Sequence, residues 1–168
     1  MTTMPILDIQ NLTIAFQQNG QQRVVVENLS LSIAKGETLA LVGESGSGKS
    51  VTALSVLRLL PSPPVVYPSG DILFNGESLL NADEKILRQH RGNNISMIFQ
   101  EPMVSLNPLH QIEKQLSEVL IIHRGMRKEA ARGEILDVLD RVGLRDAQKR
   151  LNAYPHQLSG GERQRVMI

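Results

Sequence analysis

Residues 43–50 read Gly43-Glu44-Ser45-Gly46-Ser47-Gly48-Lys49-Ser50, and this stretch decides the fold. It satisfies the P-loop pattern G-x-x-x-x-G-K-[ST]. The apolar run 38–42 precedes it and a stretch of helical character, 49–60, follows it, which is the strand, loop and helix context that the pattern requires. With glycine near 7% of residues, a chance match in a chain this long is expected less than about 1% of the time. The sequence therefore predicts a loop that binds nucleotide phosphates.

The residue types of this loop suit a triphosphate and its cation. Glycines allow the backbone to curl until several N–H groups point at the β- and γ-phosphates, and the helix N-terminus adds a partial positive charge. Lys49 supplies a mobile point charge for the phosphate oxygens, and Ser50 supplies an oxygen for Mg²⁺. We predict that ATP and Mg²⁺ bind to this set: Gly43, Glu44, Ser45, Gly46, Ser47, Gly48, Lys49, Ser50 and Val51. Kinases, GTPases, helicases and transporter ATPases all bind phosphates with a loop of this kind. Other segments of the sequence must therefore indicate to which of these classes the chain belongs.

Composition and charge narrow the class of protein. The 168 residues are 41% hydrophobic and 21% charged, which predicts one globular unit or part of one. A net charge of +1, from 18 Lys and Arg against 17 Asp and Glu, gives no broad field for nucleic acid or an anionic membrane. The sequence contains no cysteine, which excludes disulfides and thiolate metal sites from these residues. The apolar runs are too short to span a bilayer, so a cytoplasmic location is expected.

Strands are expected before the loop. Apolar residues alternate over 7–16 and 29–33, which predicts two half-buried strands. Asn19-Gly20 lies between them and accepts positive φ angles, so a tight hairpin turn is expected there. The continuous apolar run 38–42 predicts a strand that is buried on both faces.

After the loop, the pattern changes from strands to helices. Prolines after residue 60 are expected to end the helix 49–60. The segments 71–74 and 95–99 predict two further strands, the second one buried. From about 106 to 157, apolar residues recur at helical spacing, and Gly143 stands where a helix C-terminus favours a left-handed residue. This region is expected to form a small helical subdomain.

A second segment resembles an anion site. Residues 158–164 read Leu158-Ser159-Gly160-Gly161-Glu162-Arg163-Gln164. Ser159 and the two glycines precede an expected helix, so they offer a hydroxyl, exposed amides and a positive helix end. Taken alone, an ordinary turn before a helix would be the better interpretation. Beside Gln164 and the P-loop, a second phosphate-binding segment is the better one.

These segments, in this order, resemble the ATP-binding subunits of ABC transporters. Residues 43–51 (GESGSGKSV) and 97–108 (MIFQEPMVSLNP) resemble the peptide and nickel importer branch, and most of all the tandem ATPase of oligopeptide and microcin C import. The resemblance implies an α/β fold, in which a P-loop NTPase sheet carries an N-terminal antiparallel β subdomain and a helical subdomain. The expected parts are a β subdomain with the P-loop core at 1–105, a helical subdomain at about 106–157, and the signature motif with the start of its helix at 158–168.

The resemblance also implies roles for single residues. Gln100 matches the Q-loop glutamine that reaches Mg²⁺ and the attacking water, which makes it the expected catalytic residue and a second metal contact. Phe16 matches the aromatic residue that stacks on adenine, although a core residue on an alternating strand remains an equal alternative. Four residues of the signature motif match the family segment that faces the P-loop of another subunit and completes the ATP site of that subunit. They are Ser159, Gly160, Gly161 and Gln164.

The implied function is that of an importer subunit that couples ATP binding and hydrolysis to the uptake of peptides or related solutes. The implied partners are a second ATP-binding domain, integral-membrane permease subunits that hold it at the inner membrane and, indirectly, a periplasmic solute-binding protein.

The family pattern continues into a strand ending in Asp-Glu and a switch histidine, and Ile168 precedes both. An incomplete domain with little hydrolysis of its own is therefore expected. A non-catalytic nucleotide-binding remnant and a DNA-repair type of ABC ATPase remain alternatives.

Overall fold

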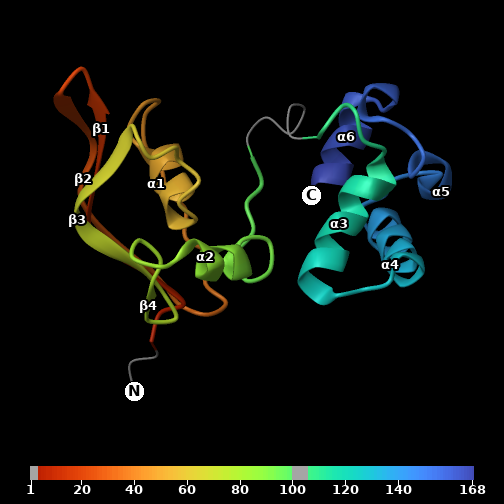
Figure 1. Cartoon of the computed structure of the whole chain (residues 1–168), viewed down its shortest axis with the longest axis horizontal. Coiled ribbons are helices and arrows are strands. Elements are labelled where there is room, and N and C mark those ends of the chain that lie inside the picture. Colours follow the sequence, from red (N-terminus) through yellow and green to blue (C-terminus); the bar gives the residue numbers. More distant parts are fainter. Residues whose placement is uncertain (1–3, 100–105) are drawn as a thin grey trace. The chain divides into compact units, whose positions relative to one another are not determined.

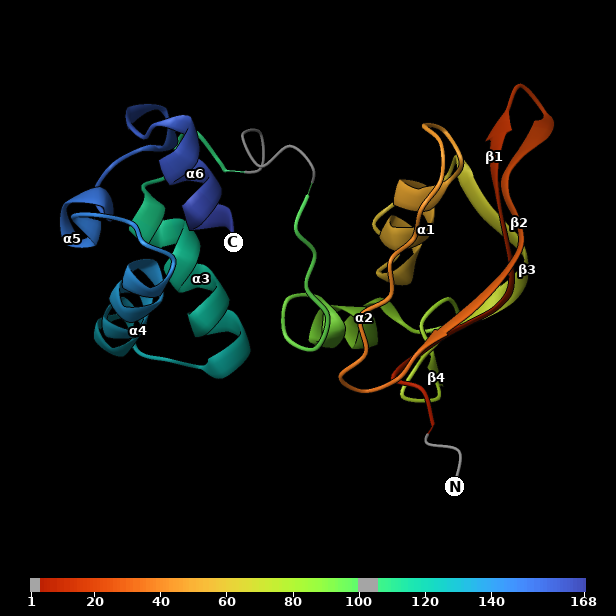
Figure 2. The same cartoon turned by 180° about the vertical axis from the view of Figure 1, so that it is seen from behind.

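The computed structural model describes residues 4–99 and 106–168. The chain divides into two compact units, Met1–Arg91 and Gly92–Ile168, which are considered separately below (Figures 1 and 2). The sequence placed the division later, near residue 105. An α/β fold is confirmed, with an antiparallel sheet in the first unit and helices in both.

The first unit is built on a four-stranded antiparallel sheet with the order β2-β1-β3-β4. Its strands are β1 (Leu7–Gln18), β2 (Gln21–Ile33), β3 (Val65–Phe74) and β4 (Glu77–Ser78). Asn19 and Gly20 join β1 to β2 with φ angles of 51° and 77°. Positive φ at both central residues matches the twist of paired strands, so the predicted hairpin is confirmed.

Two helices lie on the same side of this sheet in both views, α1 (Lys49–Val56) and α2 (Glu84–His90) (Figures 1 and 2). The core beneath them holds three residues of β1, Ile9, Leu12 and Ile14, each at most 2% exposed. Side chains alternate across a strand, so Leu12 and Ile14 share one face of β1. The register shift between Ile9 and Leu12 lets Ile9 be buried as well, although it lies an odd number of residues away. The P-loop helix thus begins on a packed sheet.

Helix α1 is shorter than the sequence predicted. It ends at Val56, with Leu57 as its C-cap, whereas the prolines that were expected to end it begin at residue 61. Arg58 has a φ of 48°, a left-handed conformation that is incompatible with continuing the helix. The chain therefore leaves the helix before it reaches the prolines.

Both strands predicted as buried are absent from the described part of the chain. The segments 38–42 and 96–99 carry no regular secondary structure, and Val42 and Ile98 are 91% and 66% exposed. An extended segment becomes a strand only when a neighbour accepts its backbone hydrogen bonds. Within the described residues, the strands that pair are β1 to β4, and neither segment joins their sheet.

The second unit is helical, as the sequence predicted. Its elements are α3 (Ile112–Arg124), α4 (Lys128–Arg141), α5 (Ala147–Arg150), the 3₁₀ turn η2 (Pro155–Gln157) and α6 (Gly160–Met167). A buried cluster that includes Ile112, Leu139 and Leu158 joins them. Gly143 follows α4 with a φ of 74°, which confirms the left-handed residue expected there.

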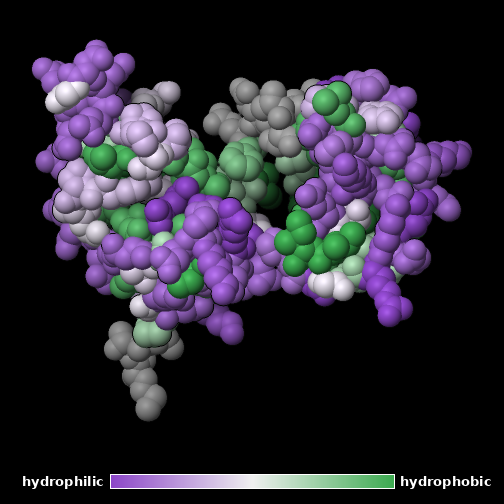
Figure 3. All heavy atoms as spheres, viewed as in Figure 1, coloured by the Kyte–Doolittle hydropathy of each residue, from purple (hydrophilic) through white to green (hydrophobic). Residues whose placement is uncertain are grey.

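Hydrophilic side chains dominate the face of the molecule drawn in Figure 3, and smaller apolar groups interrupt them. Exposed apolar residues occur in both units, for example Val42 in the first and Ile122 in the second. Over 4–99 and 106–168, no helix is long and apolar enough to cross a bilayer.

Candidate nucleotide-binding site

The P-loop closes around the ammonium group of Lys49. This residue is the first of α1, and its side chain turns back toward the loop that precedes the helix. Its Nζ donates to the carbonyl oxygens of Gly43 at 2.7 Å and Glu44 at 2.6 Å, and to Ser47 Oγ at 3.1 Å. Three acceptors from one loop thus hold the positive charge within the loop itself.

Glycines give the loop its shape for two different reasons. Gly46 and Gly48 have φ angles of 84° and 88°, where a side chain is strained. A Cβ atom on Gly48 would also lie 2.7 Å from Val26 Cγ2 and 3.1 Å from the Val25 carbonyl oxygen, so this glycine lets the loop approach β2 closely. A Cβ atom on Gly46 would meet nothing within 4 Å, so that position is open.

The start of α1 presents unused backbone donors. The amides of Gly48 and Lys49 have no acceptor within the described residues, as expected of the first turn of a helix. These N–H groups and the helix dipole favour an anion at this end. The same segment contains Ser45, Ser50 and Val51, the remaining residues of the predicted loop set.

Mg²⁺ usually binds through one or two protein oxygens together with substrate phosphates. The exposed side chain of Ser50, in the first turn of α1, fits that limited role. The described residues contain no cluster of three or more His, Cys, Asp or Glu that would hold a cation by itself.

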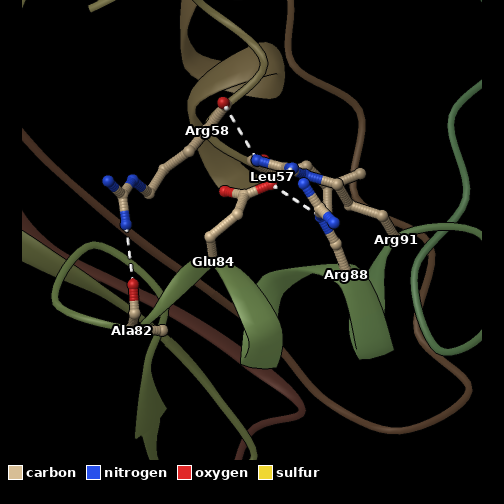
Figure 4. Close-up of polar contacts among 6 residues, drawn as sticks. All are labelled: Leu57, Arg58, Ala82, Glu84, Arg88 and Arg91. Carbon is tan, nitrogen blue, oxygen red and sulfur yellow. Dashed lines mark hydrogen bonds and ion pairs between the residues drawn. The ribbon is translucent and has the colours of Figure 1, made fainter.

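The far end of α1 is tied down by an arginine that the sequence did not single out (Figure 4). Arg91 Nε donates to the carbonyl oxygen of Leu57 at 2.9 Å, and its Nη2 donates to that of Arg58 at 3.2 Å. Its Nη1 pairs with Glu84 Oε1 at 2.7 Å. The guanidinium group thus joins the C-terminal end of the P-loop helix to α2.

Arg91→Ala is expected to lower the free energy of unfolding by about 1.5 to 3 kcal/mol, the usual range for hydrogen bonds to a charged group. Urea unfolding followed by circular dichroism measures it. Arg88→Ala is the matched control, because Arg88 is 77% exposed and contacts the same Glu84 at 3.4 Å. A surface pair of this kind contributes about 0 to 1 kcal/mol. If both variants lower the free energy of unfolding equally, the hydrogen bonds from Arg91 to the end of α1 do not stabilise the fold as proposed.

The structure places Phe16 near the end of β1, opposite Arg23 of β2 and Val65 of β3. Its side chain is half-buried, so the residue has an exposed part that could contact a base. Gln100, the expected catalytic residue, lies outside the described residues. Its role stays a prediction.

The signature segment forms the N-terminus of α6. Ser159 is the N-cap, and its Oγ accepts from the Glu162 amide at 3.3 Å while Glu162 Oε2 accepts from the Ser159 amide at 2.7 Å. The amides of Gly160 and Gly161 find no acceptor in the described part of the chain. A Cβ atom on Gly161 would meet nothing within 4 Å, so this turn is open to an anion. Gln164 is exposed one turn further along α6.

Two residues that support this turn were missed by the sequence interpretation. Glu162 completes the reciprocal capping box, and the Ser-x-x-Glu spacing is a signal that could have revealed it. Arg150 of α5 pairs with Glu162 Oε1 at 2.8 Å, and no local pattern marks that contact. Hydrogen bonds from the amide and side chain of Ser159, together with Arg150, hold the pKa of Glu162 below its ordinary value.

Each unit therefore carries one segment suited to phosphate. The first unit offers a lysine, a curled glycine loop and a helix start, which suit the chain of phosphates of a nucleotide. The second offers a helix start with a serine cap and an open glycine, Gly161. This is the chemistry of phosphate binding at helix N-termini.

Comparison with known proteins is consistent with this chemistry. A family model described as ABC transporter matches residues 26–168. The chain is 71% identical over 166 residues to the uncharacterized ABC transporter ATP-binding protein YejF of Escherichia coli K12, covering 99% of this chain and 31% of YejF. It is 45% identical over 163 residues to the oligopeptide transport ATP-binding protein OppD of Bacillus subtilis 168, covering 97% and 46%. The chain thus spans from about a third to about a half of these relatives.

Among solved structures, the chain is similar to the dimeric structure of MJ0796, a bacterial ABC transporter cassette. The TM-score is 0.82 at 28% sequence identity, and the match covers 96% of this chain and 67% of the cassette. A structure of the same cassette in a post-hydrolysis state bound to ADP and Pi matches with a TM-score of 0.81.

Proposed function

Because the chain belongs to the ABC transporter family, we propose that it is the ATP-binding part of an importer, in which ATP binding and hydrolysis drive the uptake of peptides or related solutes. The observation that carries this proposal is the Lys49 ammonium group, held by three acceptors of a glycine loop at the start of α1. A positive charge in that position is suited to the β- and γ-phosphates of ATP.

The loop binds ATP by exchanging internal contacts for contacts with phosphate. As the triphosphate enters, Lys49 Nζ gives up loop acceptors in favour of phosphate oxygens, and the amides of Gly48 and Lys49 donate to the same anion. Ser50 Oγ and Gln100 are the proposed protein contacts of a Mg²⁺ ion, which would neutralise phosphate charge when bound with the nucleotide. Phe16 is the proposed stacking partner of the adenine ring.

Completion of the site requires a second ATP-binding domain. Ser159, Gly160, Gly161 and Gln164 are proposed to meet the γ-phosphate of the nucleotide on that partner, through the open N-terminus of α6. Gln100 is proposed to orient the attacking water when the two domains close. The dimeric state of the similar MJ0796 cassette supports this arrangement.

The remaining partners follow from the importer proposal. Integral-membrane permease subunits would hold the protein at the cytoplasmic face of the inner membrane, and a periplasmic solute-binding protein would deliver the solute. The oligopeptide transport name of OppD, and the peptidoglycan transport name of a YejF protein of Agrobacterium fabrum C58 that is 55% identical over 99% of this chain, support a peptide-like solute. Such names favour an importer over a DNA-repair ATPase.

Calorimetric titration with MgATP and with adenosine tests the proposal. We expect MgATP to bind at least about tenfold more tightly than adenosine, because charge-assisted bonds to phosphate contribute about 1.5 to 3 kcal/mol each. Inorganic tripolyphosphate with Mg²⁺ should compete with MgATP. Equal affinity for adenosine and MgATP, or no competition, would exclude the loop as the principal binding element.

A further inference from the structure

The first turn of α6 contains an acidic residue, Glu162, beside amides that are proposed to receive phosphate. An isolated carboxylate there would repel a phosphate, because like charges a few ångströms apart raise the energy of the bound state. The side chain of Glu162 is only 19% exposed, so water screens its charge incompletely. The turn therefore needs a device that neutralises this residue and holds it in place.

Arg150 and Ser159 supply that device. One carboxylate oxygen of Glu162 accepts from the Ser159 amide at 2.7 Å, and the other pairs with Arg150 Nη2 at 2.8 Å. Both oxygens are thereby directed to fixed partners. The Ser159 and Glu162 amides are occupied by the capping box. Those of Gly160 and Gly161 have no acceptor among the described residues, so they are the amides that we assign to a ligand.

Arg150 keeps this position at some cost. Its side chain is 39% exposed, yet its Nε is buried and has no hydrogen-bond partner in the described part of the chain. A buried donor without a partner is unfavourable. The ion pair with Glu162 is the interaction that compensates for it, and this pair joins α5 to the first turn of α6.

We propose that Arg150 is a positioning residue of the signature segment, which neutralises Glu162 and holds its carboxylate on the Ser159 amide so that the Gly160 and Gly161 amides can bind a nucleotide phosphate. This inference rests on the proposed function of the segment. It adds a residue on another helix whose effect passes through Glu162. The lowered pKa of Glu162 agrees with this pairing.

The test is a double-mutant cycle that removes the charges of Arg150 and Glu162 separately and together. Binding is followed at the backbone amides of Gly160 and Gly161. Two-dimensional ¹H–¹⁵N spectra of the full chain are recorded during titration with MgATP, for the wild type, Arg150→Gln, Glu162→Gln and the double variant. Glutamine at 162 keeps the capping-box acceptor and removes its charge. We expect Arg150→Gln to raise the half-saturating concentration at Gly160 and Gly161 about two- to fivefold, the usual effect of one charge in a helix terminal turn. The double variant, which adds Glu162→Gln to Arg150→Gln, should return to the wild-type half-saturating concentration.

Three results would overturn the inference. The first is that Arg150→Gln leaves the half-saturating concentration at Gly160 and Gly161 unchanged. The second is that this concentration stays raised in the double variant, which would indicate a purely structural role for Arg150. The third is that Gly160 and Gly161 of the wild type do not respond to MgATP while Gly46 and Gly48 do. In that case, the P-loop still binds nucleotide and only the inference about Arg150 fails. If Gly46 and Gly48 also do not respond, the proposed function fails as well.

Discussion

Lys49→Ala is expected to weaken MgATP binding about 10- to 150-fold. The wild-type ammonium group lies among three acceptors of the loop that is proposed to bind the phosphates, with contacts of 2.6 to 3.1 Å. Alanine removes both the charge and its donors, and a hydrogen bond to a charged group contributes about 1.5 to 3 kcal/mol. Isothermal titration calorimetry measures the change directly.

The matched control for this variant is Lys35→Ala. Lys35 is exposed in the turn that follows β2, and its loss changes the net charge by the same amount. We expect that variant to bind MgATP within about twofold of the wild type, because an exposed charge outside the loop is screened by salt. If both variants lose the same affinity, the effect is general electrostatics. If Lys49→Ala binds as well as the wild type, residues 43–50 are not the nucleotide site.

The geometry of the P-loop was predictable because it is local. The spacing of Gly43, Gly48 and Lys49 within eight positions fixes a curled loop at a helix start, and the positive φ of Gly48 is what that curl requires. The hairpin at Asn19-Gly20 is local in the same sense, since two residues determine the turn type. Short-range patterns of this kind do not depend on the rest of the fold.

Predictions that depended on distant partners were wrong or were not made. The runs 38–42 and 95–99 have the composition of buried strands, but burial needs neighbours, and neither run joins the described sheet. The tie from Arg91 to Leu57 joins residues 34 positions apart. A hydrophobic pattern records how apolar a segment is and contains no information about which strand or carbonyl it will meet. Such contacts emerge only from the folded chain.

Gly70→Ala is expected to lower the free energy of unfolding by about 2 to 5 kcal/mol. Gly70 has a φ of 85°, where a side chain costs about 1 to 2 kcal/mol. A Cβ atom there would also lie 2.4 Å from each of the carbonyl oxygens of Gln10 and Asn11. Both atoms belong to the backbone of β1, so the strand itself must move, and overpacking of this kind costs about 1 to 3 kcal/mol.

The tight contact arises from an irregular register between β1 and β3. Gln10 pairs with Asp71 and Thr13 pairs with Ser69, so two residues of β1, at positions 11 and 12, stand opposite the single Gly70. A bulge of this type bends the strand and brings its carbonyl groups toward the partner strand. Glycine is the residue that leaves room for them.

Gly20→Ala separates the two causes, because Gly20 has a similar φ of 77° but a Cβ atom there would meet nothing within 4 Å. This variant should lower the free energy of unfolding only by the cost of placing a side chain at a positive φ angle, about 1 to 2 kcal/mol. Urea unfolding of the two variants therefore measures the steric term as a difference, expected to be at least about 1 kcal/mol. Equal losses would mean that β1 yields to the new methyl group at no cost. A bulge held by ladder hydrogen bonds on both sides should resist such a shift, since each lost bond leaves a backbone group to be satisfied elsewhere.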